Sequence, residues 1–383
     1  MIDLDHNATT RVRDEALAAM DRAWRTAGGN PGSRHALGRR ARQVLEEARE
    51  QIAAILNAAP TEVIFTGGGT EAINLALQGL AVGRPGTIAL TPGEHPATEE
   101  SVRALQQRGW QRSEIAIDAS GRMVPDRLSQ LPWDEIRLAT VLLAHNETGV
   151  IQDIAPLAQH CRERRIPLHV DAVQAVGKID VDFQALGATA LSIAAHKFHG
   201  PRGIGALLLR EGVRLSPLLY GGHQESGRRP GTECAPLAAG MATALQLWHE
   251  TREQSTRQVS RLRDQLAAGL AEQCRPIVVH GSLGHRLPNT LSVAFPGCDG
   301  DALLVALDLE GVCCSLGSTC ASGSSEPAPI LTAMGVPPAV ARSTLRLSLG
   351  IDNTAQEIAT AVQTISGIVA RLRKTSGNNR ADA

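Results

Sequence analysis

Short apolar runs alternate with longer amphipathic stretches from about Arg39 to Ala271. The apolar runs have the length of strands, and the stretches between them repeat apolar positions at the spacing of one helix face. This alternation predicts an α/β fold with a mainly parallel sheet. The runs that carry the prediction are EVIFT, TIALTP, RLATVLLAH, IPLHVDAV, ALSIAA and GALLLR.

A long helical period begins near Ala235 and continues to Gln273, with no proline after Pro236. It predicts a connecting helical segment. Beyond it, RPIVVHG, NTLSVAFP, ALLVALDLEGVCCS and TLRLSLG predict the strands and helices of a smaller α+β unit. We therefore expect a large domain of residues 12–250, a smaller domain of residues 1–11 and 251–375, and a flexible tail of residues 376–383.

Composition limits the partners that the chain can have. Its 383 residues carry a formal net charge of −1, so no global field attracts nucleic acid or an acidic membrane surface. No apolar run reaches the ~20 residues needed to span a bilayer. Aromatic residues make up 2% of the chain, which argues against a base-stacking surface. We expect no nucleic-acid partner and no membrane partner.

The seven cysteines are odd in number and scattered, which does not suggest a disulfide framework. With no leader sequence before IDLDHNATT, we expect a reducing, cytoplasmic location. Cys320 lies among small residues in SLGSTCASG and is expected on a mobile, exposed loop as a working thiol. Cys313 and Cys314 end an apolar run and are expected in the core. The absence of a CxxC pair and of a nearby histidine disfavours zinc.

Lys197 follows an apolar strand in LSIAAHKFHGPRGIGALLL. At the edge of a dry site, a lysine has its pKa pushed down and becomes a nucleophilic amine able to form a Schiff base. The alternative is an ordinary solvated loop lysine. Gly69 and Thr70, in FTGGGTEAINLALQGLA, lie between a strand and a helix. They could cradle a phosphate or form a plain turn, since the spacing matches neither the P-loop nor GxGxxG.

Further candidates lie near strand ends. Asp171, three residues before Gln174, could keep a pyridine nitrogen protonated or could cap a helix. His95 could stack on an aromatic ring or relay a proton, or could be solvent-exposed. Asn146 follows another strand and could likewise serve either a ligand site or only the local structure. Arg346 in TLRLSLG could hold a carboxylate with its two-pronged guanidinium, or could be a charge on a solvent face.

Together and in this order, these segments resemble the group I cysteine desulfurases of the NifS/IscS type. These belong to the class V aminotransferase superfamily of fold-type I enzymes, which use pyridoxal 5'-phosphate (PLP). The resemblance covers nearly the whole chain. Its motifs are LDHNATT, NPGSRHALGRRAR, FTGGGTEAINLA, EHPA, HNETGVIQ, HVDAVQAVGK, HKFHGPRGIGAL, GGHQESGRRPGT, SLGSTCASG and LRLSLG. It implies a large PLP-binding domain with a mainly parallel seven-stranded sheet and a smaller α+β domain.

The resemblance also implies a role for each candidate. Lys197 would form the Schiff base with PLP, Asp171 would pair with the pyridinium nitrogen, Gln174 would contact the phenolic oxygen and His95 would stack on the ring. The phosphate would be held by Gly69, Thr70 and His196, with Thr232 from the partner subunit of a homodimer. Asn146 would contact cofactor and substrate, Arg346 would bind the substrate carboxylate, and Asn7 and Asn30 would line the site.

The implied reaction converts L-cysteine to L-alanine. The Cys320 thiolate would attack the substrate sulfur and carry it as a persulfide, with His95 taking part in deprotonating the thiol. The sulfur would then pass to an acceptor protein, such as an iron–sulfur scaffold or a thiolation carrier. Selenocysteine lyase, a thiol-independent class V aminotransferase or lyase, and a non-catalytic PLP-binding scaffold are the alternatives.

Two positions depart from the family pattern. Ala194 stands where the family usually has a serine that contacts the phosphate, and Gly67 removes another hydroxyl from the TGGGTE turn. Ser192 lies on the same strand face but is expected to be too far away to replace Ala194. We therefore expect a weaker hold on PLP than in close relatives.

Overall fold

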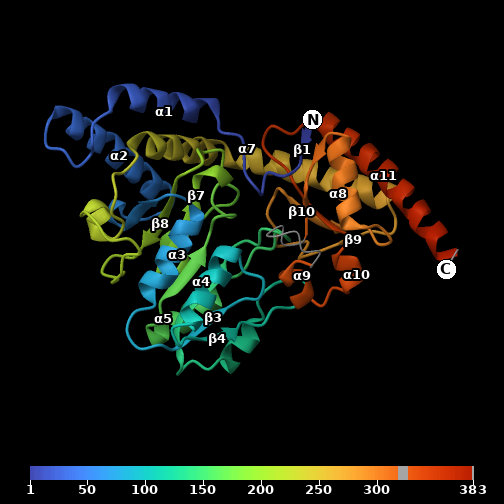
Figure 1. Ribbon diagram of the computed structural model, residues 1–383, viewed down its shortest axis with the longest axis horizontal. Coiled ribbons are helices and arrows are strands. Elements are labelled where there is room, and N and C mark those ends of the chain that lie inside the picture. Colours follow the sequence, from blue (N-terminus) through green and yellow to red (C-terminus); the bar gives the residue numbers. More distant parts are fainter. Residues whose placement is uncertain (318–326, 382–383) are drawn as a thin grey trace.

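A seven-stranded sheet forms the larger part of the molecule (Figure 1). The structure is a computed structural model that describes residues 1–317 and 327–381. The strands lie in the order β2 (Val63–Thr66), β8 (Gly205–Leu209), β7 (Ala190–Ala194), β6 (Leu168–Asp171), β5 (Ile136–Leu142), β3 (Thr87–Leu90) and β4 (Gln111–Glu114). Only β8 runs antiparallel to its neighbours, so the predicted mainly parallel sheet is confirmed.

Alternate strand residues enter two different cores, one on each face of the sheet. In β7, Leu191 and Ile193 belong to the core that also contains residues of α2 and α7, whereas Ala190 belongs to the core with α3 and α4. Because both faces are covered by helices, strands of this sheet are apolar throughout rather than alternating. This is why the short apolar runs of the sequence are strands.

Helices surround this sheet and join its strands. They are α1 (Asp14–Thr26), α2 (Ala36–Ile55), α3 (Gly69–Leu80), α4 (Pro96–Gln106), α5 (Ala155–Arg164) and α6 (Phe183–Leu186), with 3-10 turns η1 (Pro60–Glu62), η2 (Pro125–Gln130), η3 (Ala195–Lys197) and η4 (Gln224–Gly227). The predicted connecting segment is one helix, α7 (Ala235–Gln273). It crosses from the larger to the smaller part of the molecule (Figure 1).

The smaller part is built on a second sheet with its own core. Its strands lie in the order β12 (Ser315–Leu316), β13 (Thr344–Ser348), β10 (Thr290–Ala294) and β9 (Val278–Val279). Its helices are α8 (Gly300–Leu309), α9 (Pro329–Ala333), α10 (Pro338–Ala341) and α11 (Ala355–Ala381). Leu262, Leu266 and Leu270 of α7 enter this core, whereas Leu245 enters the core of the large sheet. The division into domains at residues 11, 250 and 375 stays a prediction.

The helix α11 extends further than the sequence analysis expected. Its backbone remains helical to Ala381, within the segment 376–383 that we expected to be a flexible tail. No proline interrupts the run after Ala355, so the helix is not stopped by a missing backbone N–H at residue 375.

The N-terminal segment connects the two parts of the molecule and reaches the site. β1 (Ile2–Asp3) pairs with β11 (Val312–Cys313), and Asp5 bridges to Ser348 of β13. A few residues later, the backbone N–H of Thr10 donates to the carbonyl of His196, just after β7. Residues 5–10 therefore lie between the small sheet and the strand ends of the large sheet.

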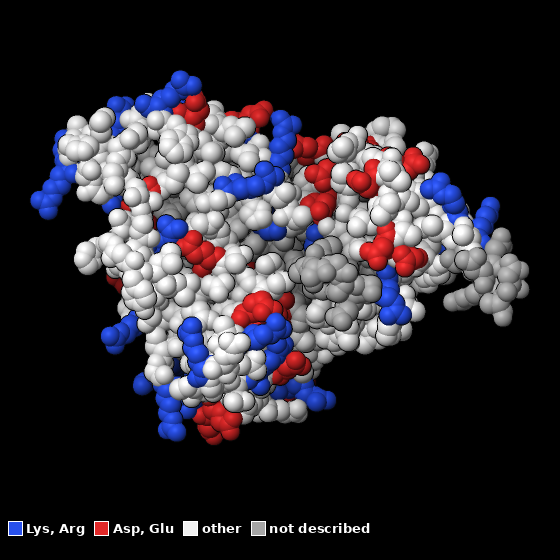
Figure 2. Space-filling model, in the orientation of Figure 1, with Lys and Arg blue, Asp and Glu red and all other residues white. Residues whose placement is uncertain are grey.

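Basic and acidic side chains are interspersed over the face drawn in Figure 2, in keeping with the net charge of −1. Within residues 1–317 and 327–381, no helix combines the length and apolar character needed to cross a membrane.

Candidate active site

A cavity of about 910 Å³ opens where the parallel strands end, which is the usual place for ligands in open α/β sheets. It lies beside the start of α3 and the ends of β5, β6 and β7. Among its lining residues are most of the predicted site residues: Gly69, Thr70, His95, Asn146, Asp171, Gln174, His196 and Lys197.

Lys197 ends the short turn η3 after β7, and its ammonium group is held by backbone carbonyls. Its Nζ donates to the oxygen of Asn7 at 2.6 Å and to that of Ala8 at 2.8 Å. Burial, followed by the charge of Arg346, lowers the pKa of Lys197 to about 8. The side chain is therefore not the solvated loop lysine that the sequence left open, and its amine is available as a nucleophile near neutral pH.

Asp171 is the last residue of β6, and its carboxylate is almost completely buried at the cavity wall. Its Oδ1 accepts the backbone N–H of Val173 at 2.9 Å. A turn follows instead of a helix, so the alternative role as a helix cap is wrong. Burial raises the pKa of Asp171 to about 6, and the nearby Lys197 opposes this shift. A buried carboxylate in this state favours a cationic partner, such as a protonated ring nitrogen.

His95 caps the N-terminus of α4 and keeps a defined tautomer. Its Nδ1 accepts the backbone N–H of Ala97 at 3.1 Å, so the proton of the neutral ring lies on Nε2. Burial and the charge of Lys197 lower the pKa of His95 to about 4. At neutral pH the ring therefore presents a donor at Nε2. To remove a proton from the Cys320 thiol, Nε2 would have to be unprotonated, which requires the tautomer with its proton on Nδ1.

The start of α3 has the shape that a phosphate group needs. A Cβ atom on Gly69 would lie 2.9 Å from Cγ2 of Val173 and 3.3 Å from Cβ of Ala194, so only glycine leaves the space open. Gly68 has a φ of 150°, in the region that favours glycine. The first N–H groups of a helix lack intrahelical partners and attract anions. Arg202 also lines the cavity and adds positive charge that the sequence analysis missed.

The missing serine hydroxyl at Ala194 is not replaced by Ser192. Ser192 is fully buried and its Oγ is hydrogen-bonded to Nε2 of His169 at 2.8 Å. The Nδ1 of His196 instead lies 3.2 Å from Oγ1 of Thr9, which also lines the cavity. Thr9 is therefore the additional hydroxyl at this end of the site.

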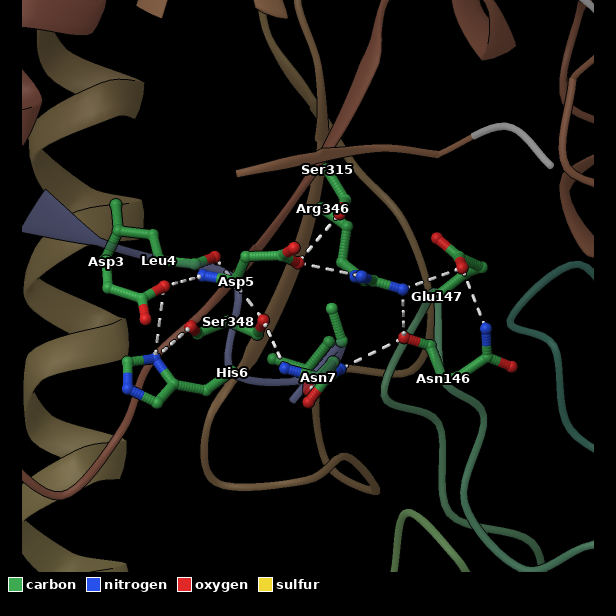
Figure 3. A network of polar contacts seen from close by, with 12 residues as sticks. Asp3, Leu4, Asp5, His6, Asn7, Asn146, Glu147, Ser315, Arg346 and Ser348 are labelled. Atoms are coloured by element: carbon green, nitrogen blue, oxygen red, sulfur yellow. Dashed lines mark hydrogen bonds and ion pairs between the residues drawn. The ribbon is translucent and has the colours of Figure 1, made fainter. Parts of the chain in front are cut away.

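Arg346 lies on β13 between two carboxylates (Figure 3). Its Nη2 lies 2.9 Å from Oδ1 of Asp5, and its Nη1 lies 2.9 Å from Oε1 of Glu147. The side chain is buried, so its alternative assignment to a solvent face is wrong. Arg346 reaches the cavity-lining residue Asn146 through a 3.5 Å contact with its carbonyl oxygen. A substrate carboxylate at Arg346 would have to share the guanidinium with Asp5 and Glu147 or displace one of them.

The carboxylates of this network are themselves fixed by neighbours. Ser315 donates to Oδ1 of Asp5 at 2.8 Å, and Nδ2 of Asn146 donates to Oε1 of Glu147 at 2.8 Å (Figure 3). Burial raises the pKa of Glu147, and the charge of Arg346 opposes this shift. No local sequence pattern points to Asp5, because it lies far along the chain from both Glu147 and Arg346.

Asn7 is buried and joins the two halves of the site. Its Nδ2 donates to the carbonyl of Asn146 at 3.0 Å and to Oγ1 of Thr290 at 2.9 Å. Its Oδ1 accepts from Asn289 and from Lys178. Asn7 therefore uses all of its amide hydrogen-bonding capacity. One of its partners is Lys178, a second lysine near the site that the sequence did not predict.

Four of the predicted residues that the structure describes do not line this cavity. Asn7 and Arg346 are buried and contact its lining residue Asn146, whereas the other two, Asn30 and Thr232, make no such contact. Asn30 and Thr232 are exposed and are not among its lining residues. Cys320 lies outside the described residues. Cys313 and Cys314, which were expected in the core, are both only half-buried. Cys314 packs against the core of the small sheet. In the part of the chain that the structure describes, no cluster of potential metal ligands occurs.

Comparison with known proteins gives consistent matches over the length of the chain. The model of the family described as aminotransferase class-V matches residues 2–360. The IscS-like cysteine desulfurase of Mycobacterium tuberculosis is 41% identical over 386 aligned positions that cover 98% of each chain. A solved structure of a NifS-like protein has a TM-score of 0.90 at 34% identity and covers 96% of this chain and 99% of its own.

A further solved structure is described as SspA in complex with cysteine. It has a TM-score of 0.80 at 29% identity, and the match covers 91% of this chain and 99% of that one. The extent of the family match and the identity to full-length relatives lead to one conclusion. This chain belongs to the aminotransferase class-V family.

Proposed function

We propose that this protein is a PLP-dependent cysteine desulfurase, which converts L-cysteine to L-alanine and carries the sulfur on Cys320. The observation that carries the proposal is the meeting of Lys197, Asp171 and the glycine-lined start of α3 in one cavity. Relatives with full-length matches are named cysteine desulfurases, and one similar structure is described with bound cysteine.

The described residues fit PLP. Members of this family are PLP-dependent enzymes. Lys197 would hold the cofactor covalently, Asp171 would face the ring nitrogen, and the start of α3 with Thr70 and His196 would hold the phosphate. Bound PLP supplies an electron sink for the charge that develops at the substrate Cα.

The chain's own residues would move protons and orient the substrate. A Lys197 amine with a pKa of about 8 can accept the Cα proton at Nζ near neutral pH. His95 holds its proton at Nε2 and can donate it within the cavity. Arg346 would bind the substrate carboxylate, with Asn146 beside it. Each of these roles agrees with the position of the residue at or behind the cavity wall.

The sulfur transfer balances without an external oxidant. The C–S bond of L-cysteine breaks, a sulfur–sulfur bond forms on Cys320, and the products are L-alanine and the enzyme persulfide. The persulfide then passes its sulfur to an acceptor, which we propose is an iron–sulfur scaffold or a thiolation carrier.

A homodimer and a cytoplasmic location complete the proposal. Thr232 is exposed in the single chain, as expected for a residue that would contribute to a partner subunit's phosphate site. The six cysteines within residues 1–317 and 327–381 are all free thiols, which suits a reducing compartment.

The test is an assay of purified protein with PLP, L-cysteine and a reductant, in which alanine and sulfide are measured. We expect equimolar products, and we expect Cys320→Ala to keep the PLP absorbance and lose sulfide release. Cys313→Ala serves as the matched cysteine control and should retain release. Full sulfide release by Cys320→Ala would contradict the persulfide mechanism, and a colourless protein that PLP does not restore would contradict the enzyme assignment. L-Selenocysteine in parallel distinguishes a selenocysteine lyase.

A further inference from the structure

Lysine is very rare in this chain, and two of its lysines lie together at the site. Lys178, Lys197 and Lys374 are the only lysines among 38 lysines and arginines. Lys374 is exposed on α11, whereas Lys178 and Lys197 line one small cavity of about 40 Å³ behind the main one. The use of lysine at position 178, in a chain that otherwise uses arginine, requires a physical reason.

Lys178 is buried without a charged partner. Only 8% of its surface is exposed, and no carboxylate within residues 1–317 and 327–381 forms an ion pair with it. Its Nζ donates to Oδ1 of Asn7 at 3.1 Å and to Oε1 of Gln174. Burying an amine is costly unless its donors are used. A compact amine fits between two amide oxygens, whereas a guanidinium is larger and planar.

Two hydrogen bonds of the Gln174 amide, one at its oxygen and one at its nitrogen, decide which way the amide points. The oxygen and nitrogen ends of a glutamine side chain have nearly the same shape, so its neighbours determine the orientation. With Oε1 occupied by Lys178, Nε2 of Gln174 donates to the backbone oxygen of Asn7 at 2.9 Å. The NH₂ group has a second hydrogen, and Gln174 lines the main cavity.

The same backbone oxygen of Asn7 also accepts from Lys197 at 2.6 Å. Lys178 therefore contacts Asn7, whose backbone oxygen accepts from Lys197, and Gln174, which donates to the same oxygen. Lys178 does not line the main cavity itself. A residue in this position acts through its neighbours and not by touching the substrate.

We propose that Lys178 is a positioning residue that fixes the Gln174 amide with its N–H toward the phenolic oxygen of bound PLP. The inference rests on the proposed function, since it assumes that PLP occupies the main cavity. Loss of Lys178 would remove one of the two contacts that fix the amide and leave only its bond to the Asn7 carbonyl. The amide oxygen would then turn toward the phenolic oxygen more often, which removes a donor and weakens PLP binding.

The test measures PLP-loaded protein by absorbance as a function of pH. Lys178→Met should raise the midpoint of the PLP titration by about one pH unit, because a phenolate without its donor holds the shared proton more tightly. The PLP dissociation constant should rise about tenfold, or about 1.4 kcal/mol. Lys178→Gln keeps a donor and should shift the titration midpoint and the dissociation constant in the same direction but by less. If Lys178→Met does not fold, Lys178→Gln is the variant that tests the proposal.

Asn289→Ala is the matched control. Asn289 is the other donor to Oδ1 of Asn7, at 3.0 Å, but it does not contact Gln174. This variant should leave the titration midpoint unchanged. In a Gln174→Ala background, Lys178→Met should cause no further shift, because the effect passes through Gln174.

An unshifted midpoint in Lys178→Met, or an equal shift in the Gln174→Ala background, would overturn the inference while wild-type protein still binds PLP. A wild-type protein that shows no PLP absorbance would overturn the proposed function instead. The two failures are therefore distinguishable.

Discussion

Arg346 and Lys197 are two cations close to one cavity, the first buried and the second half-buried, but their partners are of different kinds. Arg346 lies between the carboxylates of Asp5 and Glu147, each at 2.9 Å. Among the residues that the structure describes, Lys197 has only the neutral carbonyls of Asn7 and Ala8 as hydrogen-bond acceptors. One cation is compensated by direct ion pairs, and the other by backbone dipoles and more distant charges.

In the proposed function, this difference separates a binding group, Arg346, from a reactive one, Lys197. A guanidinium stays charged in proteins, so burial without carboxylates would be costly, and compensation keeps Arg346 in a fixed orientation. A lysine amine can lose its proton instead, and burial together with the Arg346 charge lowers the pKa of Lys197. The compensated cation therefore helps to make the uncompensated one nucleophilic.

The largest effect is expected from removing the reactive amine. Lys197→Ala should lower desulfurase activity by about 10⁴-fold, since it removes both covalent attachment and proton transfer. Alanine formation from L-cysteine measures the loss. Lys197→Arg is the matched control, because it keeps the positive charge and should be equally inactive. Activity within about tenfold of wild type in Lys197→Arg would mean that the charge, and not the amine, matters at this position, and such activity in Lys197→Ala would mean that neither is needed.

Removing the compensated cation should cost less activity and act on binding. Arg346→Gln should lower kcat/KM for L-cysteine by about 10²-fold, mainly through KM, because a charge-assisted contact is worth about 1.5–3 kcal/mol.

Glu147→Gln removes a competing carboxylate and keeps the guanidinium, so it should lower KM by about fivefold. Steady-state kinetics measure both. A raised KM in Glu147→Gln would show that Glu147 orients Arg346 more than it competes with the substrate.

The charge of Arg346 also predicts a pH effect. The unprotonated amine is the nucleophile, so the rate at which the apoprotein binds PLP should rise with pH through a midpoint of about 8, the pKa of Lys197. In Arg346→Gln the repulsion of the ammonium is removed, and the midpoint should move to higher pH. Stopped-flow absorbance gives both curves. A midpoint unchanged by Arg346→Gln would break the link between the two cations.

The smallest effect is expected at the phosphate end. Ala194→Ser should lower the PLP dissociation constant by about fivefold, since one added hydrogen bond is worth about 1 kcal/mol. Ser192→Ala is the control on the same strand. It removes a hydroxyl bonded to His169 and should change thermal stability without changing PLP affinity. A dissociation constant that Ala194→Ser leaves unchanged would contradict the expected weak hold on PLP.

The surroundings of Lys197 could be predicted from the sequence better than those of Arg346. Asp171 ends one apolar strand and Lys197 ends the short turn that follows another, and the buried ends of such strands meet at one edge of a parallel sheet. The partners of Arg346 lie 341 and 199 residues away along the chain, and no local pattern brings Asp5 and Glu147 to the same guanidinium.

Lys178 was missed for a related reason. It lies in a turn, four residues after Gln174, and a single lysine in a turn is usually exposed. Its burial depends on the N-terminal segment, which places Asn7 against it. Asn30 and Thr232 were predicted from the family resemblance alone, and in the single chain they remain outside the cavity.

The most direct test of the account identifies which amine reacts, since Lys178 and Lys197 both line one small cavity. The PLP-loaded protein is reduced with borohydride and digested, and the modified peptide is sequenced by mass spectrometry. The account predicts modification at Lys197, with Lys178 unmodified, and no modified peptide from Lys197→Ala. Modification at Lys178 in the wild-type protein would contradict the account.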